Sequence, residues 1–268
     1  MSMAPMAVVP GERYGFFTDT SICIGCKACE VACKEWNDVP EERHGFSGTS
    51  YDNSGRLGAN RWRHVAFVEQ PAPPQRNGDG QLRWLMSSDV CKHCDRAACL
   101  EVCPTGALFR TEFGTVVVQE DVCNGCGYCV PACPFGVIDQ RAGDGRVWKC
   151  TLCYDRIKVG GEPACSQACP TKSIQFGPLA LLHSRAAERV EALRKDGQPG
   201  ARLYGADHGD GVGGMGAFFL LLDEPEVYGL PPDPVVTTRD LPGMWRAAGA
   251  AAAALAALVA AAVAGGRR

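Results

Sequence analysis

The sequence predicts an α+β fold made of two nested repeat units, followed by a C-terminal extension and one membrane-spanning helix. Two observations support this prediction. The chain has 268 residues and 16 cysteines, and the cysteines fall into four similar groups, three of which share a closing phrase. Near the C-terminus, 20 consecutive uncharged residues run from Ala247 to Gly266.

Each cysteine group has four members and ends with a step of three intervening residues. The spacings are x2-x2-x3, x2-x4-x3, x2-x2-x3 and x2-x11-x3, where x is any residue. A repeated unit of this size predicts a repeated structure, so the fold depends on how the four groups pair. In chain order the groups are Cys23, Cys26, Cys29, Cys33; Cys91, Cys94, Cys99, Cys103; Cys123, Cys126, Cys129, Cys133; and Cys150, Cys153, Cys165, Cys169.

The closing cysteine opens a shared phrase in three groups: CPTGAL from Cys103, CPFGVI from Cys133 and CPTKSI from Cys169. The first group lacks the proline and continues as CKEW. Because proline interrupts a helix and the phrase then reaches β-prone residues, each unit is expected to be a cysteine loop followed by a short strand. The stretches TVVVQ, 115–119, and FFTD, 16–19, are the expected partner strands.

Three further segments are predicted outside the cysteine groups. The alternating stretch RWRHVAFVEQ, 61–70, predicts a surface strand, and the polar runs PEERHGFSGTS and PAPPQRNGDG around it predict loops. Residues 178–197 predict an amphipathic helix that stops at Gly197. GDGVGG, 209–214, lacks the Lys-Ser/Thr of a phosphate-binding loop and is expected to be an ordinary loop.

The uncharged C-terminal stretch is long enough to cross a membrane once. It contains 13 Ala, 3 Gly, 2 Leu and 2 Val, and a helix of this length rises about 30 Å, the thickness of the hydrocarbon core of a bilayer. Alanine contributes little apolar transfer energy, so an alanine-rich tail in water is the alternative. Trp245 before the stretch, Arg267 and Arg268 after it, and its small residues favour a membrane anchor.

Composition and motifs exclude several functional classes. The net charge of -3 gives no basic surface for general nucleic-acid binding. The N-terminal MSMAPMAVVP has neither the basic nor the apolar region of a secretory signal. The sequence contains no nucleophile motif and no HExxH motif of a metal hydrolase. No substrate site is therefore predicted in this chain.

The stretch CIGCKACEVAC, 23–33, indicates the cofactor. Three thiolates within seven residues can surround one cube of iron and sulfide, and the fourth stands one residue further away. In bacterial two-cluster ferredoxins, which share this spacing, the fourth cysteine binds the other cluster of the pair. At four cysteines per cluster, the 16 cysteines predict four [4Fe-4S] clusters.

Zinc and disulfides are the chemical alternatives. Structural zinc uses two C-x2-C pairs per ion, which leaves the additional cysteines of these groups without a role. Disulfides are disfavoured because no secretory signal accompanies the cysteines. A zinc-binding scaffold protein is therefore the remote alternative to an electron carrier.

The short separation between Cys103 and Cys123 predicts that the second and third groups form a compact two-cluster unit, in which each closing cysteine serves the other cluster. The first and fourth groups then pair in the same way. The predicted ligand sets are set 1, Cys23, Cys26, Cys29 and Cys169; set 2, Cys33, Cys150, Cys153 and Cys165; set 3, Cys91, Cys94, Cys99 and Cys133; and set 4, Cys103, Cys123, Cys126 and Cys129.

Basic residues stand beside the thiolates in sequence. Positive charge near an anionic cluster raises its reduction potential, although a solvated surface position is the alternative for each residue. His93, between two cysteines of the second group, is expected to pack or to form hydrogen bonds rather than to bind metal. The basic residues are Lys27, Lys34, Lys92, Arg96, Lys149, Arg156 and Lys172.

Several phrases resemble one known family. They are CIGCKACEVACKEWND, YDN, CGYCVPACPFGV, KCTLCYDR, EPACSQACPTKSIQFG, GVGG and YGLP. Together they resemble the iron–sulfur β subunit of membrane-bound respiratory formate dehydrogenase, from about Thr18 to the C-terminal helix. The cysteine framework alone is shared with relay subunits of dimethyl sulfoxide, polysulfide and nitrate reductases, which are the alternative within this class.

The resemblance implies an electron-transfer subunit without catalytic residues of its own. It implies a molybdenum or tungsten pterin catalytic subunit that oxidises formate, and a membrane cytochrome b subunit that passes electrons to quinone. It also implies a single-pass protein of the cell membrane with its cluster domain on the periplasmic face, although the cytoplasmic face stays open because the positive residues around the helix are balanced.

The predicted domains follow from these assignments. A four-cluster ferredoxin-like domain covers 15–177, with an inner ferredoxin at about 88–144. A helical and loop extension that contacts partner subunits covers 178–243, and the transmembrane helix covers 244–266.

Overall fold

The computed structural model describes residues 8–41, 46, 48, 51–71 and 82–265. The polar runs predicted as loops, 40–50 and 71–80, lie largely outside these residues. The chain divides into two compact units, Met1–Val236 and Thr237–Arg268. Each unit is described by itself.

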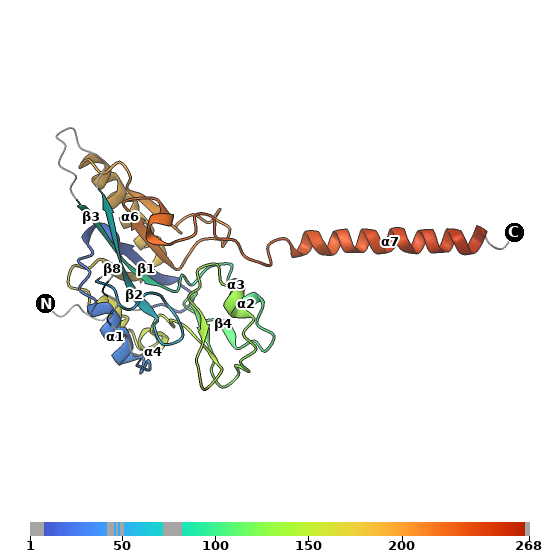
Figure 1. Ribbon diagram of the computed structural model, residues 1–268, viewed down its shortest axis with the longest axis horizontal. Coiled ribbons are helices and arrows are strands. Elements are labelled where there is room, and N and C mark those ends of the chain that lie inside the picture. Colours follow the sequence, from blue (N-terminus) through green and yellow to red (C-terminus); the bar gives the residue numbers. More distant parts are fainter. Residues whose placement is uncertain (1–7, 42–45, 47, 49–50, 72–81, 266–268) are drawn as a thin grey trace. The chain divides into compact units, whose positions relative to one another are not determined.

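A four-stranded sheet joins the two ends of the first unit. Its strand order is β8-β1-β10-β9, and β1 and β8 lie side by side in Figure 1. Phe16 of β1 is in register with Phe176 on the antiparallel side and with Ala217 on the parallel side. The strands are β1 (Tyr14–Asp19), β8 (Ile174–Pro178), β9 (Arg202–Tyr204) and β10 (Ala217–Leu221).

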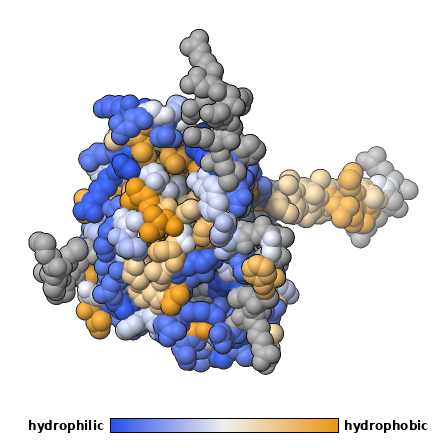
Figure 2. All heavy atoms as spheres, turned by 60° about the vertical axis from the view of Figure 1, so that its left-hand side comes forward, coloured by the Kyte–Doolittle hydropathy of each residue, from blue (hydrophilic) through white to orange (hydrophobic). Residues whose placement is uncertain are grey.

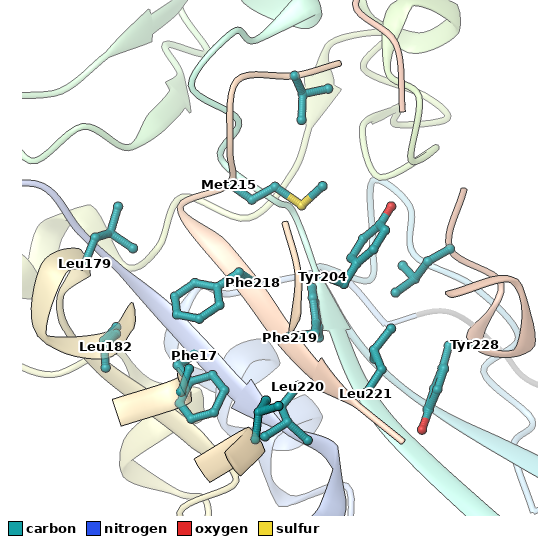
Figure 3. Close-up of a cluster of buried hydrophobic side chains, with 14 of the residues drawn as sticks. Phe17, Leu179, Leu182, Tyr204, Met215, Phe218, Phe219, Leu220, Leu221 and Tyr228 are labelled. Atoms are coloured by element: carbon teal, nitrogen blue, oxygen red, sulfur yellow. The ribbon is translucent and has the colours of Figure 1, made fainter. Parts of the chain in front are cut away.

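Helix α6 (Leu179–Lys195) covers this sheet and confirms the amphipathic helix predicted from sequence. Its buried residues recur every three or four positions, which places them on one face. Figure 3 shows Leu179 and Leu182 beside Phe17 of β1 and Phe218 of β10, whose rings stack 5.4 Å apart. The buried residues of the helix are Leu179, Leu182, Ala186, Val190 and Leu193.

In every cysteine group, the third cysteine lies on a short helix that was not predicted from the sequence. Where proline follows the closing cysteine, the helix has four residues, because proline cannot continue it. The first group lacks that proline, and its helix runs on through the closing cysteine for nine residues. These helices are α1 (Ala28–Trp36), α2 (Ala98–Glu101), α3 (Cys129–Ala132) and α5 (Ala164–Gln167); α4 (Tyr154–Ile157) follows Cys153.

A short strand follows each proline-containing phrase, as predicted. β4 (Leu108–Arg110) pairs with β5 (Val116–Val118), and β6 (Asp139–Gln140) pairs with β7 (Val147–Trp148). The third such strand is β8, which pairs with β1. The two stretches expected to supply partner strands therefore do so.

A long hairpin lies between the outer and the inner cysteine groups. β2 (Arg63–Pro71) is the predicted strand, and it pairs with β3 (Leu82–Val90), which was not predicted. The expectation that β2 is a surface strand is wrong for its first residues, because Arg63 and Val65 are each only 1% exposed. The reason is that β2 is covered on its inner face by the cysteine loops rather than by solvent. The first unit also contains the 3-10 turns Thr20–Ile22 and Pro225–Tyr228.

The second unit contains α7 (Leu241–Gly265), a helix of 25 residues. All of its described side chains are exposed, and its mean hydropathy over the most apolar window is 2.2. Figure 2 shows this helix coloured toward the hydrophobic end of the scale. By length and composition, α7 is a candidate membrane span, as the sequence predicts.

Candidate metal centres

The thiols of set 1 come from opposite ends of the cysteine region. Burial raises the pKa of Cys23, and the neighbouring thiols of Cys169 and Cys26 raise it further. Cys29 lies on α1, with its Sγ 3.2 Å from the Ser88 hydroxyl, and burial raises the pKa of its thiol to about 11. The pairing of β1 with β8 brings the loop after β1 close to the closing cysteine before β8.

The thiols of set 2 form the most enclosed group, since all four cysteines are buried. Burial raises the pKa of Cys33 well above its usual value, and repulsion from Cys150, Cys165 and Cys153 adds to this. Cys33 reaches these residues because α1 packs against α5, which carries Cys165. The long first helix thus carries its closing cysteine away from its own loop.

The thiols of set 3 line one cavity. This cavity is walled by Cys91, Cys94, Cys99 and Cys133, together with His93, Lys92 and Lys149. Burial raises the pKa of Cys94, and the thiols of Cys91, Cys133 and Cys99 raise it further. Cys133 comes from the third group, whereas the other three cysteines come from the second.

The thiols of set 4 lie nearer the surface. Burial raises the pKa of Cys129 to about 12, and the thiols of Cys103, Cys123 and Cys126 contribute to the rise. Cys103 differs, because hydrogen bonds from the backbone of Leu108 and from Thr105 outweigh burial and lower its pKa. The thiols of sets 2, 3 and 4 therefore lie near one another, as do those of Cys23, Cys26 and Cys169 in set 1, whereas the main thiol neighbour of Cys29 is Cys165 of set 2. That each set binds one shared cluster stays a prediction.

The four sets also adjoin one another in a series. Cys29 of set 1 interacts electrostatically with Cys165 of set 2. Cys150 of set 2 interacts with Cys91 of set 3, and Cys99 of set 3 interacts with Cys129 of set 4. The order along the protein is therefore set 1, set 2, set 3, set 4.

Two of the predicted basic residues are buried beside the sets. Lys92 pairs with Asp89 and donates to the Val90 carbonyl at 2.9 Å. Lys149 donates to the Cys150 carbonyl at 2.9 Å and to the Val116 carbonyl. The other predicted basic residues, Lys27, Lys34, Arg96, Arg156 and Lys172, are partly or fully exposed.

Arg63 is a third buried cation, and it was not predicted from the sequence. Its Nη2 lies 3.3 Å from the Sγ of Cys165. In an alternating strand, residues 63, 65 and 67 share one face. An arginine on the same face as valine and phenylalanine was the signal that could have identified it.

A polar network holds the first cysteine loop against β2. Lys27 donates to Glu30 at 3.1 Å, to Asp52 at 3.0 Å and to the Ser54 hydroxyl at 2.8 Å. His64 of β2 lies 3.2 Å from Asp52. Burial acts to raise the pKa of Asp52, but hydrogen bonds from Ser54 and Lys27 outweigh it and lower the pKa to about 2. Lys27 therefore has a structural role in this network.

Two buried donors near the sets have no hydrogen-bond partner among the residues that the structure describes. His93 Nδ1 accepts a hydrogen bond from the Val116 amide at 3.1 Å, which confirms its predicted hydrogen-bonding role, so Nε2 carries the proton. His93 Nε2 and Arg63 Nε are both buried and without a hydrogen-bond partner. Such donors require an acceptor, and the sulfides and thiolates of an iron–sulfur cluster are anionic acceptors. The residues present therefore fit iron–sulfur clusters.

The described side chains show no grouping typical of a zinc site. A tetrahedral zinc with Zn–S bonds of about 2.3 Å requires sulfurs about 3.8 Å apart. Within the described residues, which include all 16 cysteines, no three His, Cys, Asp or Glu side chains are grouped to hold one ion. A cube of four irons binds each thiolate to a different iron, which suits thiols that are further apart.

Comparison with known proteins identifies the family. A family model described as a 4Fe-4S dicluster domain matches residues 82–179, and a second model of the same description matches 22–107. The chain is 42% identical over 234 residues to the iron-sulfur subunit of nitrate-inducible formate dehydrogenase of Escherichia coli, covering 86% of this chain and 76% of that protein. The chain belongs to the formate dehydrogenase iron–sulfur subunit family. It is thus an electron-transfer subunit that carries [4Fe-4S] clusters and has no catalytic role of its own.

Two further relatives distinguish this family from the alternative. The formate dehydrogenase iron-sulfur subunit of Haemophilus influenzae is 41% identical over 240 residues, covering 88% of this chain and 74% of that protein. A subunit of the anaerobic dimethyl sulfoxide reductase of Escherichia coli is 37% identical over 178 residues, covering 65% of this chain and 77% of that protein. The likeness to formate dehydrogenase subunits therefore extends further along the sequence.

Proposed function

We propose that this chain relays electrons through four [4Fe-4S] clusters, from a molybdenum or tungsten pterin subunit that oxidises formate to a membrane cytochrome b subunit that reduces quinone. Sets 1 to 4 are the proposed ligand sets, nested so that sets 3 and 4 form the inner ferredoxin-like unit. The domains proposed are 15–177 for the clusters, 178–243 for the extension and 244–266 for the transmembrane helix.

The observation that carries this proposal is the unbroken series of neighbouring thiols. Each set has a cysteine close enough to the next set for mutual repulsion, through the pairs Cys29 and Cys165, Cys150 and Cys91, and Cys99 and Cys129. A cluster supplies one-electron chemistry without forming or breaking bonds to substrate. Clusters held at these four positions make a continuous path.

The exposure of the cysteines indicates which sets the partner subunits can reach. Cys26 in set 1 and Cys126 in set 4 are exposed, whereas all the cysteines of set 2 are buried. An apolar side chain is exposed beside each end set: Ile24 is 58% exposed and Tyr128 is 64% exposed. A partner can approach a cluster only where its ligands reach the surface, so sets 1 and 4 are the proposed contacts with the two partner subunits.

The proposed membrane anchor is α7, which is long and apolar enough for one crossing. The proposed location is the cell membrane, with the first unit on the periplasmic face. The resemblance to respiratory formate dehydrogenases supports this orientation. Labelling of a cysteine introduced at the C-terminus with a membrane-impermeant reagent in intact cells tests it, because a periplasmic first unit leaves the C-terminus unlabelled.

Stopped-flow reduction tests the relay. The purified chain should bleach in the visible range with dithionite but not with formate. After addition of the pterin subunit that co-purifies with it, formate should bleach the same absorption. Formate-dependent bleaching by the chain alone would contradict the proposal. Re-oxidation of the dithionite-reduced clusters by dimethyl sulfoxide or polysulfide through the co-purifying subunit, with no bleaching by formate, would favour the related relay function of dimethyl sulfoxide or polysulfide reductases.

A further inference from the structure

Arg63 is held in the interior at the start of β2. Its side chain is 1% exposed, and its guanidinium stacks over the ring of Phe16 at 4.8 Å. Nη1 donates to the carbonyl of Ser88 at 3.2 Å and to the Ser88 hydroxyl at 3.3 Å. These contacts fix the plane of the guanidinium and leave Nη2 and Nε for other partners.

The free side of the guanidinium faces the outer cysteine sets. Nη2 lies 3.3 Å from the Sγ of Cys165, and Nε has no hydrogen-bond partner in the described parts of the chain. The charge also interacts with Cys29 of set 1 and with Cys150 and Cys33 of set 2. Arg63 therefore stands between two sets rather than inside one.

The charge of Arg63 is not neutralised by a carboxylate. In the parts of the chain that the structure describes, no Asp or Glu forms an ion pair with it. A buried unpaired charge is costly unless an opposite charge lies nearby. The largest electrostatic effects on the Arg63 guanidinium come from thiols of sets 1 and 2, with Cys165 first. Lys92, in contrast, is paired with Asp89.

We propose that Arg63 is a positioning residue that raises the reduction potentials of both outer clusters, those of sets 1 and 2. This inference rests on the proposed function, in which each set holds a cluster. Reduction of a cluster adds one electron and breaks no bond, and a fixed positive charge in a buried site stabilises that added charge. No proton is exchanged, because arginine stays protonated in proteins. The arrangement allows one side chain to keep two neighbouring clusters matched in potential.

The test is a redox titration of the complete complex, followed by electron paramagnetic resonance. The variant Arg63→Gln removes the charge and keeps a hydrogen-bonding group. At the potential where an outer cluster of the wild type is half reduced, its reduced-to-oxidised ratio should fall at least tenfold, which is a 59 mV shift for one electron. Both outer clusters should shift to lower potential, and set 2 should shift more because Nη2 contacts Cys165.

Three matched variants separate charge from structure. Arg63→Lys keeps the charge and should restore at least half of the shift. Lys92→Gln removes a buried charge beside Cys94 and Cys133 and should shift the set 3 cluster instead. Arg185→Gln removes an exposed charge on α6 and should leave all four midpoints unchanged. A shift in Arg63→Lys as large as that in Arg63→Gln would overturn the role of charge.

Two further measurements, of the iron content and of the wild-type protein, distinguish a failure of this inference from a failure of the proposed function. If the complex holds about sixteen irons per chain and the outer midpoints of Arg63→Gln stay within error of the wild type, the inference fails while the relay stands. If Arg63→Gln does not fold, wild-type protein with ¹⁵N-labelled arginine is measured by pulsed spectroscopy. Nitrogen coupling to both outer cluster signals is expected, and its absence from both would overturn the inference.

Discussion

The ligand pairing predicts an unusual pattern when cysteines are removed in pairs. Cys165 and Cys169 are neighbours on one short segment, yet Cys165 is assigned to set 2 with Cys33, and Cys169 to set 1 with Cys23. Cys23 and Cys169 are 146 residues apart in the sequence, but their thiols are electrostatic neighbours. Removing two distant cysteines should therefore cost one cluster, and removing two adjacent ones should cost two.

The size of the effect follows from four irons per cluster. Intact protein should hold about sixteen irons, and each single variant, Cys23→Ala, Cys169→Ala or Cys165→Ala, about twelve. The double variant of Cys23 and Cys169 should also hold about twelve, because both residues serve one cluster. The double variant of Cys165 and Cys169 should fall to about eight.

Iron analysis and electron paramagnetic resonance of anaerobically purified protein measure this pattern. If an altered cluster keeps three of its irons, the iron count no longer separates the variants. The number of altered spectral signals is then counted instead, and cysteines of one set should alter the same signal. In a local arrangement, each group of four encloses its own cube. Then the Cys165 and Cys169 double variant would keep about twelve irons and the Cys23 and Cys169 double variant about eight, and the nested pairing would be refuted.

Three further predictions concern the metal, the anchor and acid stability. Metal analysis should find about sixteen irons per chain and no stoichiometric zinc; zinc with little iron would exclude the assignment. Deletion of 244–268 should release the first unit from membranes after a high-salt wash, whereas wild-type protein that is already soluble would rule out the anchor. Burial lowers the pKa of His64 against the opposing effect of Asp52, so below about pH 6.5 the unfolded chain binds a proton that the folded chain does not. His64→Gln should therefore flatten the fall in thermal midpoint below that pH, and an unchanged slope would contradict this.

The elements that sequence could predict are those with a local pattern. The strands after the closing phrases and helix α6 each follow from proline placement or from a periodicity within a few residues. The cysteine-loop helices were missed because α2, α3 and α5 are single turns of four residues, too short to show an amphipathic period. β10 was missed because the run AFFLL is buried throughout and does not alternate.

The site was predictable where the residue type itself indicates the chemistry. Spacing assigns the cysteines to sets, and that assignment stays a prediction. His93 was predicted to pack or to form hydrogen bonds, and its Nδ1 accepts one from the Val116 amide. Arg63 could not be assigned, because its role depends on β2 being covered by the cysteine loops, and that contact joins residues 102 positions apart. The burial of Lys92 and Lys149, among seven basic candidates, likewise depends on tertiary packing that spacing does not reveal.

The pairing of β1 with β8 and β10 has a consequence for the order of biosynthesis. The sheet around residue 16 stays incomplete until residue 217 has been synthesised. At a ribosomal rate of roughly 5 to 20 residues per second, this takes about 10 to 40 s. The inner segment leaves the ribosome much earlier, as one continuous piece. It contains both inner cysteine groups, which lie between Cys91 and Cys133, and the small hairpins beside them. The inner sites can therefore receive iron and sulfide while the chain is still growing, whereas the outer thiols of the first group stay without Cys169 until most of the protein has been made.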